Sequence, residues 1–182
     1  RLFLKICFMK QKNKCEYSLF LAMGSNLGER EINIEEAYQR IEKQVGSISS
    51  KSAFFYSAPE GFDSKNNFVN TVCEVRTIMS IYEVFSITQD IECQLGRVDK
   101  SSSHGYKDRV IDIDLILAGK LIVNSENLIV PHPKFHQRNF VLIPLCEIAP
   151  EIIHPIFGKT IKELKSEYDQ LLDKQNNLST EV

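Results

Sequence analysis

The 182-residue sequence carries almost no net charge, because its 22 basic and 24 acidic side chains nearly cancel. That balance favours neither a nucleic acid nor a membrane surface as a partner. No apolar run approaches the roughly 20 residues that a membrane-spanning helix needs. No internal repeat or domain linker interrupts the chain, so its length suits one domain with a substantial core.

The cysteines are odd in number and none of them forms a Cys-x-x-Cys pair, which argues against both a disulfide framework and a zinc site. Buried thiols in a reducing compartment fit this usage better, so the sequence predicts a cytoplasmic protein. The five residues are Cys7, Cys15, Cys73, Cys93 and Cys146.

The first eight residues are apolar and basic, but no small-residue cleavage site of a signal peptide follows them. We therefore expect residues 1–16 to be an N-terminal extension that is partly non-native, with Met9 as the expected native start. A single domain is predicted over residues 17–172. Residues 173–182 are polar and are expected to form a frayed tail.

Hydrophobic periodicity predicts an α+β domain. Strands are expected over Tyr17–Met23, Ser47–Tyr56, Phe68–Thr77, Lys107–Leu117 and, as a short strand or hairpin return, Leu121–Val123, and helices over Glu29–Val45, Ile81–Leu95 with Ser80 as N-cap, and Ile161–Leu172. Ser57–Asn67 and Gly96–Tyr106 should be long loops, and recurrent prolines should keep the helices between Val130 and Pro155 short. The order strand–helix–strand–strand–helix–strand is typical of the ferredoxin-like βαββαβ fold, an antiparallel sheet with helices packed on it.

The run Lys107–Leu117 (KDRVIDIDLIL) carries the strongest functional signal. Its β-branched apolar residues predict a mostly buried strand, which Asp112 and Asp114 interrupt. Side chains two positions apart on a strand share a face, with Cα atoms roughly 6.5 Å apart. Burying two like charges together is unfavourable unless a cation compensates them. The pair therefore suits one or two Mg²⁺ ions that also bind substrate phosphates.

The alternative is that both aspartates face water at a strand end or pair with nearby arginines. Cations gathered in the segments that flank the strand favour a metal–polyphosphate site, because phosphoryl transfer depends on positioning and charge stabilisation. They are Arg97, Lys100, Lys107, Arg109, His132, Lys134 and Arg138.

Two other features bear on a ligand. Gly24–Gly28 (GSNLG) follows a strand and precedes a helix, but it lacks both the Lys-Ser/Thr ending of a phosphate loop and the three-glycine dinucleotide pattern, so a structural turn is favoured. Phe68 and Asn70 share one strand face, and Phe140 could oppose Phe68 to sandwich a flat heterocycle. Ordinary core packing of both phenylalanines is the alternative.

Five segments together resemble one known family. They are Gly24–Gly28, Phe55–Asn70, Ile91–Arg97, Arg109–Leu115 and Val130–Pro144. In these segments, spread over Tyr17 to Gly158, the sequence is similar to the 6-hydroxymethyl-7,8-dihydropterin pyrophosphokinases of the folate pathway. The resemblance implies transfer of pyrophosphate from ATP to the pterin hydroxymethyl group, with AMP as the second product. It also implies two Mg²⁺ ions and a monomer that binds the pterin and ATP. Neither a nucleic acid nor a membrane is expected as a partner.

The resemblance also implies roles for single residues. Asp112 and Asp114 would coordinate the Mg²⁺ ions, and Arg97 and Arg109 would close on the phosphates. The positions expected to contact the nucleotide are Gln89, Glu92, Lys100, Leu115, His132 and Arg138. The positions expected to contact the pterin are Ala58, Pro59, Gly61, Asn70 and the sandwiching pair Phe68 and Phe140. Glu60, Asp99 and Pro133 depart from the family pattern, and Asp99 should oppose phosphate binding by its loop.

Two rival functions remain at this point. A palm-type nucleotidyl transferase or cyclase also uses paired carboxylates on such a sheet, but it spaces them across two strands. A non-catalytic ferredoxin-like sensor would have no use for the gathered carboxylates and cations. We expect the two long loops to act as lids that exclude water during transfer.

Overall fold

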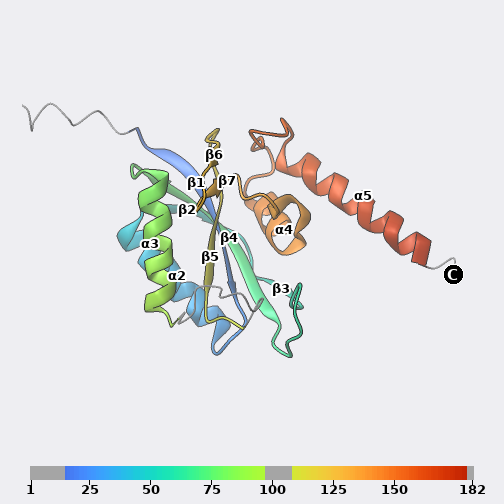
Figure 1. The fold of residues 1–182 in the computed structure, drawn as a ribbon, viewed down its shortest axis with the longest axis horizontal. Coiled ribbons are helices and arrows are strands. Elements are labelled where there is room, and N and C mark those ends of the chain that lie inside the picture. The colour runs from blue at the N-terminus through green and yellow to red at the C-terminus, as the bar shows by residue number, and fades with distance from the viewer. Residues whose placement is uncertain (1–14, 97–107, 180–182) are drawn as a thin grey trace, which may run out of the picture.

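The computed structural model describes residues 15–96 and 108–179. They form an antiparallel sheet covered by helices on both faces, with α2 and α3 on one face and α4 and α5 on the other (Figure 1). The helices are α2 (Arg30–Gln44), α3 (Ile81–Gln94), α4 (Asn139–Ile148) and α5 (Ile161–Ser179), with a 3₁₀ turn, η1, at Phe135–Gln137. Among the helices of this described part, none is both long and apolar enough to cross a membrane.

The main sheet has the strand order β2-β4-β1-β5, and β3 also pairs with β4. Its strands are β1 (Tyr17–Ser25), β2 (Ser47–Lys51), β3 (Phe55–Ser57), β4 (Phe68–Thr77) and β5 (Asp112–Ala118). All of these pairs are antiparallel. The predicted ferredoxin-like α+β fold is therefore confirmed. A separate hairpin joins β6 (Val123–Asn124) to β7 (Ile129–Val130).

The predicted strand Ser47–Tyr56 is instead two strands, β2 and β3, separated at Ser52. The backbone N–H of Ser52 donates to the carbonyl of Val72, while the Ser52 hydroxyl accepts the Val72 N–H at 3.0 Å. A side-chain oxygen thus replaces a backbone acceptor in the ladder, and regular pairing stops there.

The start of α3 agrees with the sequence prediction, whereas the end of α5 does not. Helix α3 begins after Ser80, whose hydroxyl accepts the Glu83 N–H while the Glu83 carboxylate accepts the Ser80 N–H, which confirms the predicted N-cap. Helix α5 continues to Ser179, so the predicted helix end at Leu172 is wrong. No glycine or proline lies between Asp173 and Ser179 to end the helix.

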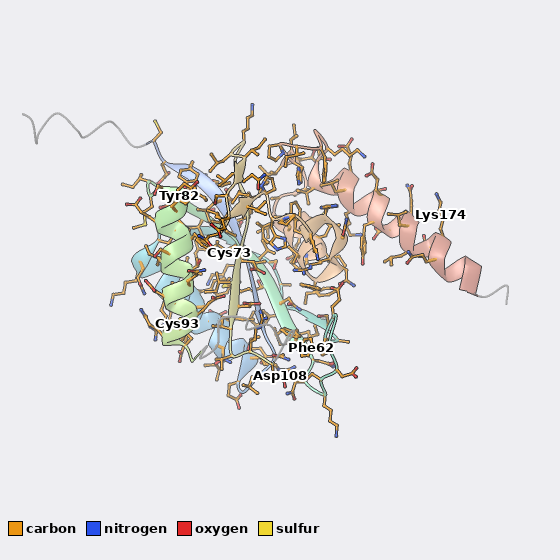
Figure 2. All side chains as sticks on the ribbon, in the orientation of Figure 1. Phe62, Cys73, Tyr82, Cys93, Asp108 and Lys174 are labelled. Atoms are coloured by element: carbon orange, nitrogen blue, oxygen red, sulfur yellow. The ribbon has the colours of Figure 1, made fainter. Side chains whose placement is uncertain are left out.

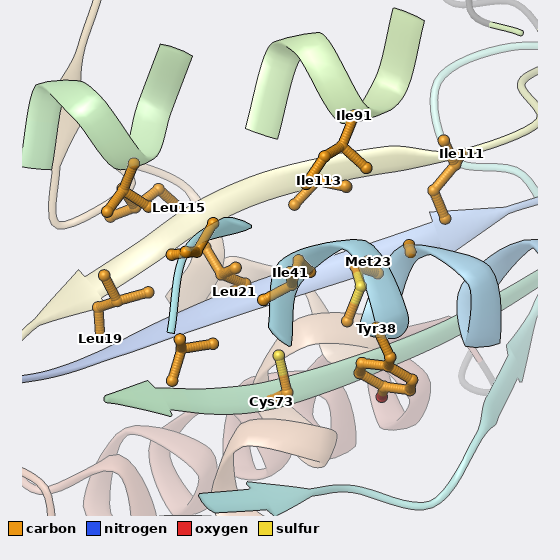
Figure 3. Packing of buried hydrophobic residues seen from close by; sticks show 14 of the residues in the cluster. Leu19, Leu21, Met23, Tyr38, Ile41, Cys73, Ile91, Ile111, Ile113 and Leu115 are labelled. Atoms are coloured by element: carbon orange, nitrogen blue, oxygen red, sulfur yellow. The ribbon is translucent and has the colours of Figure 1, made fainter. Parts of the chain in front are cut away.

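Strand β1 is buried on both faces because helices cover both sides of the sheet. Leu19, Leu21 and Met23 point into the core under α2 and α3 (Figure 3), while Phe20 and Ala22 point into the core under α4 and α5. The strict alternation of a strand thus supplies two hydrophobic layers from consecutive residues. Because β1 pairs with both β4 and β5, it sets the register of these two strands relative to each other.

Candidate active site

A cavity of about 380 Å³ opens on the face of the sheet that carries α4. It lies where β1 ends and where β4 and β5 begin, and the loop after β3 and the start of α4 close its sides. Its volume is that of a small-molecule site, which typically lies between 300 and 1,000 Å³. The cavity is lined by Ala22, Met23, Gly24, Ser57, Ala58, Glu60, Gly61, Phe62, Phe68, Asn70, Arg109, Asp112, Asp114, Lys134, Gln137, Arg138, Phe140 and Val141.

The floor of the cavity is made by small residues of β1. Gly24 lies between Asn70 on β4 and Asp112 on β5, and Ala22 pairs with Asp114. A Cβ atom on Gly24 would lie 3.0 Å from Oδ1 of Asn70 and 3.5 Å from Cδ1 of Phe68. A side chain at this position would therefore crowd Asn70 and Phe68.

Both predicted aspartates line this cavity from β5, and both are half-buried. The guanidinium of Arg109 forms an ion pair with Oδ2 of Asp112, in which the two side chains are 16% and 23% exposed. Pairing with a nearby arginine, the alternative drawn from the sequence, is thus realised for Asp112. Asp112 still lines the cavity together with Asp114, and Arg109 lines it as well.

The start of β5 is held in place by two buried polar side chains. Asn26 is only 2% exposed. Its backbone N–H donates to the Arg109 carbonyl, and its side-chain Oδ1 accepts the Arg109 N–H at 2.7 Å. Glu92 on α3, 6% exposed, accepts the Ile113 N–H at 2.7 Å. Gly24 and Ser25 extend β1, so the turn predicted over Gly24–Gly28 can begin only after Ser25. Asn26, which follows them, holds the acidic strand in place.

Aromatic side chains and an amide make up the other side. Asn70 donates its amide N–H to the Ser57 hydroxyl at 3.0 Å and to the Phe55 carbonyl at 3.3 Å, which fixes its oxygen toward Gly24. The rings of Phe62 and Phe68 meet edge to face with centroids 6.3 Å apart. Phe140, on α4, also lines the cavity.

The cavity gathers many of the residues proposed from the sequence. They are Ala58, Gly61, Phe68, Asn70, Arg109, Asp112, Asp114, Arg138 and Phe140. Pro59, Gln89, Glu92, Leu115 and His132 do not line it. The Leu115 side chain lies in the core under α2 and α3, because it alternates with Asp114 on the strand. Arg97, Asp99 and Lys100 lie outside the described residues.

Several lining residues escaped prediction: Ala22, Met23, Gly24, Ser57, Phe62, Gln137 and Val141. Ala22 and Gly24 carry no chemical group, so only the alternation of small residues on β1 could have indicated them. Phe62 lies in a loop already assigned to the ligand, and an aromatic residue there was an available signal. Gln137 precedes Arg138, which was predicted, and it shares the short connection into α4.

His132 does not supply the positive charge expected of it. Burial is the main cause that lowers its pKa to about 4, and the positive charges of Arg138 and Lys134 add to it. Its Nδ1 accepts the Lys134 N–H at 3.2 Å, which requires an unprotonated nitrogen. The ring is therefore neutral at neutral pH, and the cations at the cavity are Arg109, Lys134 and Arg138 among the described residues.

This shift predicts a pH dependence of stability. The folded chain disfavours protonated His132, so the unfolded chain binds the extra proton between pH 6.5 and about 4. The free energy of unfolding should fall as the pH falls through that window, by on the order of 3 kcal/mol for this residue. His136 and His154 have lowered pKa values too, so His132→Gln has to be compared with the unmodified chain by denaturant unfolding at pH 7.5 and 4.5. An equal stability difference at both pH values would contradict the assignment.

The chain is similar to known proteins of one family. The family model of the 7,8-dihydro-6-hydroxymethylpterin-pyrophosphokinases matches residues 20–150. The 2-amino-4-hydroxy-6-hydroxymethyldihydropteridine pyrophosphokinase of Porphyromonas gingivalis is 39% identical over 138 residues, which cover 75% of this chain and 93% of that protein. The folic acid synthesis protein FOL1 of Dictyostelium discoideum is 37% identical over 147 residues, which cover 81% of this chain but 22% of that protein.

Solved structures show the same fold. The wild-type HPPK-DHPS of Plasmodium falciparum with SDX-DHP superposes with a TM-score of 0.72 at 14% identity, over 90% of this chain and 46% of that one. The chain thus spans less than half of that protein, and a smaller share of the Dictyostelium one. What those longer proteins do outside the matched part does not transfer to this chain.

Proposed function

The chain belongs to the 7,8-dihydro-6-hydroxymethylpterin-pyrophosphokinase family, and we propose that it transfers the pyrophosphoryl group of ATP to the hydroxymethyl group of 6-hydroxymethyl-7,8-dihydropterin in folate biosynthesis. The observation that carries the proposal is the cavity itself. It joins two half-buried carboxylates, Asp112 and Asp114, to two phenylalanines, Phe68 and Phe140, and to three cations. A flat heterocycle and a polyphosphate would each meet matching groups there.

The pterin would occupy the aromatic side of the cavity. Phe68 and Phe140 would stack on its two faces, as aromatic side chains do with nucleobases. The oxygen of Asn70 would accept an N–H from the pterin edge, because the amide nitrogen is already used by Ser57 and Phe55. Backbone groups near Ala58 and Gly61 would bind the remaining edge atoms.

The donor set at Asp112 and Asp114 fits Mg²⁺. Carboxylate oxygens are hard ligands, and Mg²⁺ commonly takes one or two of them together with substrate phosphates. Among the described residues, no three His, Cys, Asp or Glu side chains lie together as a self-sufficient metal site. Asp112 and Asp114 would hold the ions, and phosphate oxygens would complete the shell. When bound, Mg²⁺ would offset phosphate charge and make the hydroxymethyl oxygen a better nucleophile.

The residues of the chain would act mainly by positioning and charge. Arg109, Lys134 and Arg138 would stabilise the negative charge that spreads over the phosphates during transfer. The pterin oxygen would form a bond to the β-phosphorus of ATP, the bond from that phosphorus to the α-phosphate oxygen would break, and AMP would leave. The hydroxyl proton would pass to a carboxylate that lines the cavity, and we propose Asp112 for this role; His132 does not line the cavity.

The two rival functions lose support. Both acidic residues lie on β5 alone, whereas a palm-type enzyme places them on two strands. A sensor module would not belong to a family of pyrophosphokinases. The cytoplasmic location, the monomeric state and the absence of nucleic-acid and membrane partners stay predictions from the sequence, as do lid motions of the loops after β3 and α3.

A direct assay tests the function. The chain is incubated with ATP, Mg²⁺ and the pterin, and the nucleotide products are separated. We expect AMP and the pterin diphosphate in equal amounts, and neither product when the pterin is omitted or the Mg²⁺ is chelated. Formation of ADP in place of AMP, or AMP formation that does not depend on the pterin, would overturn the proposal.

A further inference from the structure

Asp108 connects two segments that border the cavity. Its Oδ1 accepts the amide N–H of Asn26 at 2.7 Å, and its Oδ2 accepts the amide N–H of Asn66 at 2.6 Å. Asp108 precedes Arg109 in the chain, whereas Asn66 lies near the end of the loop that follows β3. Asp108 and Phe62 of that loop are found at the same end of the molecule (Figure 2).

The contacts of Asp108 favour its charged form. The hydroxyl of Ser64 is the largest cause that lowers the pKa of this carboxyl, and the amides of Asn66 and Asn26 lower it further. An ionised carboxylate only accepts hydrogen bonds, and here each oxygen meets an amide donor. Ser64 and Asn66 belong to one loop, so two of the three donors come from the same segment.

That loop, residues 58–67, forms one wall of the cavity. It contributes Ala58, Gly61 and Phe62 to the lining, and it leads directly into Phe68. The Asn26 side-chain amide also donates to the carbonyl of Asn66, at 3.4 Å. Asn26 holds the Arg109 backbone through the two bonds described above, one from its backbone N–H and one to its Oδ1. One buried asparagine and one carboxylate thus fasten the wall at residues 58–67 to the segment that carries Arg109 and Asp112.

We propose that Asp108 is a positioning residue for the pterin: it holds residues 58–67 against the Arg109–Asp112 segment in the conformation that the substrate requires. The proposal rests on the proposed function for the identity of the ligand. Asp108 does not line the cavity, so it would act through Phe62, Phe68 and Arg109 and not by touching the substrate. Its removal should affect pterin binding more than turnover.

The hydrogen-bond pattern offers a test by exchange of partners. Asn66→Asp places a second carboxylate against Asp108, so the two segments should repel each other. In the double variant Asn66→Asp with Asp108→Asn, the new amide donates to the new carboxylate while its oxygen still accepts from Asn26. The double variant therefore keeps the bond from Asn26 and restores the bond between positions 66 and 108 with donor and acceptor reversed. Asp108→Ala removes them, and Asp63→Ala, an exposed carboxylate in the same loop, is the matched control.

Three readouts are measured for each variant: the KM for pterin, kcat, and amide hydrogen exchange of residues 58–67. We expect Asn66→Asp and Asp108→Ala to raise the KM for pterin about tenfold and to speed exchange in the loop, with kcat changed less than about threefold. The double variant should return both quantities to within about threefold of the unmodified chain, and Asp63→Ala should change neither.

Two results would overturn the positioning role. One is an unchanged KM and unchanged exchange in Asn66→Asp and Asp108→Ala. The other is a double variant that is worse than Asn66→Asp alone, which would mean that the two residues do not act through each other. If the unmodified chain itself makes no AMP, the proposed function fails, while the exchange measurements still decide whether Asp108 holds the loop.

Discussion

Replacement of either Asp112 or Asp114 by asparagine should lower the rate of pyrophosphoryl transfer by a factor of roughly 10²–10³, the usual loss when one preorganised electrostatic group is removed from a transition state. Asparagine keeps the shape of the side chain but loses the charge. Both positions face the cavity from β5, beside the cations that would bind the phosphates. Initial rates of AMP formation, measured over a series of Mg²⁺ concentrations, provide the test.

The two variants should keep the fold. Asp112→Asn loses the ion pair with Arg109, in which the two side chains are 16% and 23% exposed. Relief of the repulsion between the two aspartates acts in the opposite direction. We therefore expect melting temperatures within a few degrees of the unmodified chain. Asp90→Asn, an exposed carboxylate on α3, is the matched control.

Recovery of normal turnover at saturating Mg²⁺ would contradict the metal assignment for the variant that shows it. An equal loss in Asp90→Asn would point to a general effect of charge on the protein and not to the site.

The sequence predicted those elements whose periodicity is local. Strand β4 has the bounds Phe68–Thr77 that alternation indicated, and α3 begins after the predicted cap Ser80. The break between β2 and β3 could not be predicted in the same way, because it depends on a hydrogen bond from Val72, twenty residues later in the chain, to the hydroxyl of Ser52. Partners that distant leave no trace in local composition.

In the site, too, local signals were readable from the sequence and long-range contacts were not. Asp112 and Asp114 were evident because two carboxylates are conspicuous inside an apolar strand. The local sequence favours a turn at Gly24. Its actual position between Asn70 and Asp112 depends on the register of three strands, which the local sequence does not determine.

Two other candidates show what residue type alone does not determine. Leu115 belongs to the right strand, but its side chain points to the opposite face, into the core. His132 was counted as a cation by residue type, whereas burial and two neighbouring positive charges lower its pKa to about 4. Residue type and motif thus identify candidates, while the face of the strand and the electrostatic surroundings decide what each can do.

Phe140→Ala should weaken pterin binding about 5- to 150-fold, which corresponds to the 1–3 kcal/mol by which aromatic stacking holds one nucleobase. Binding of an ATP analogue alone should change far less, because Phe140 belongs to the aromatic side of the cavity. The Arg138 guanidinium carbon lies 5.8 Å from the centroid of the Phe140 ring, so a small effect on the nucleotide is expected through that contact. Isothermal calorimetry of each ligand separates the two effects.

Phe140 is half-buried and also packs against the core under α4 and α5, so alanine alone cannot separate stacking from stability. Phe140→Leu keeps an apolar side chain of similar volume but has no ring to stack. We expect Phe140→Leu to retain the melting temperature within a few degrees and still lose most of the pterin affinity that Phe140→Ala loses. Equal losses for pterin and ATP analogue, or full pterin affinity in Phe140→Leu, would show that Phe140 serves the core and not the substrate.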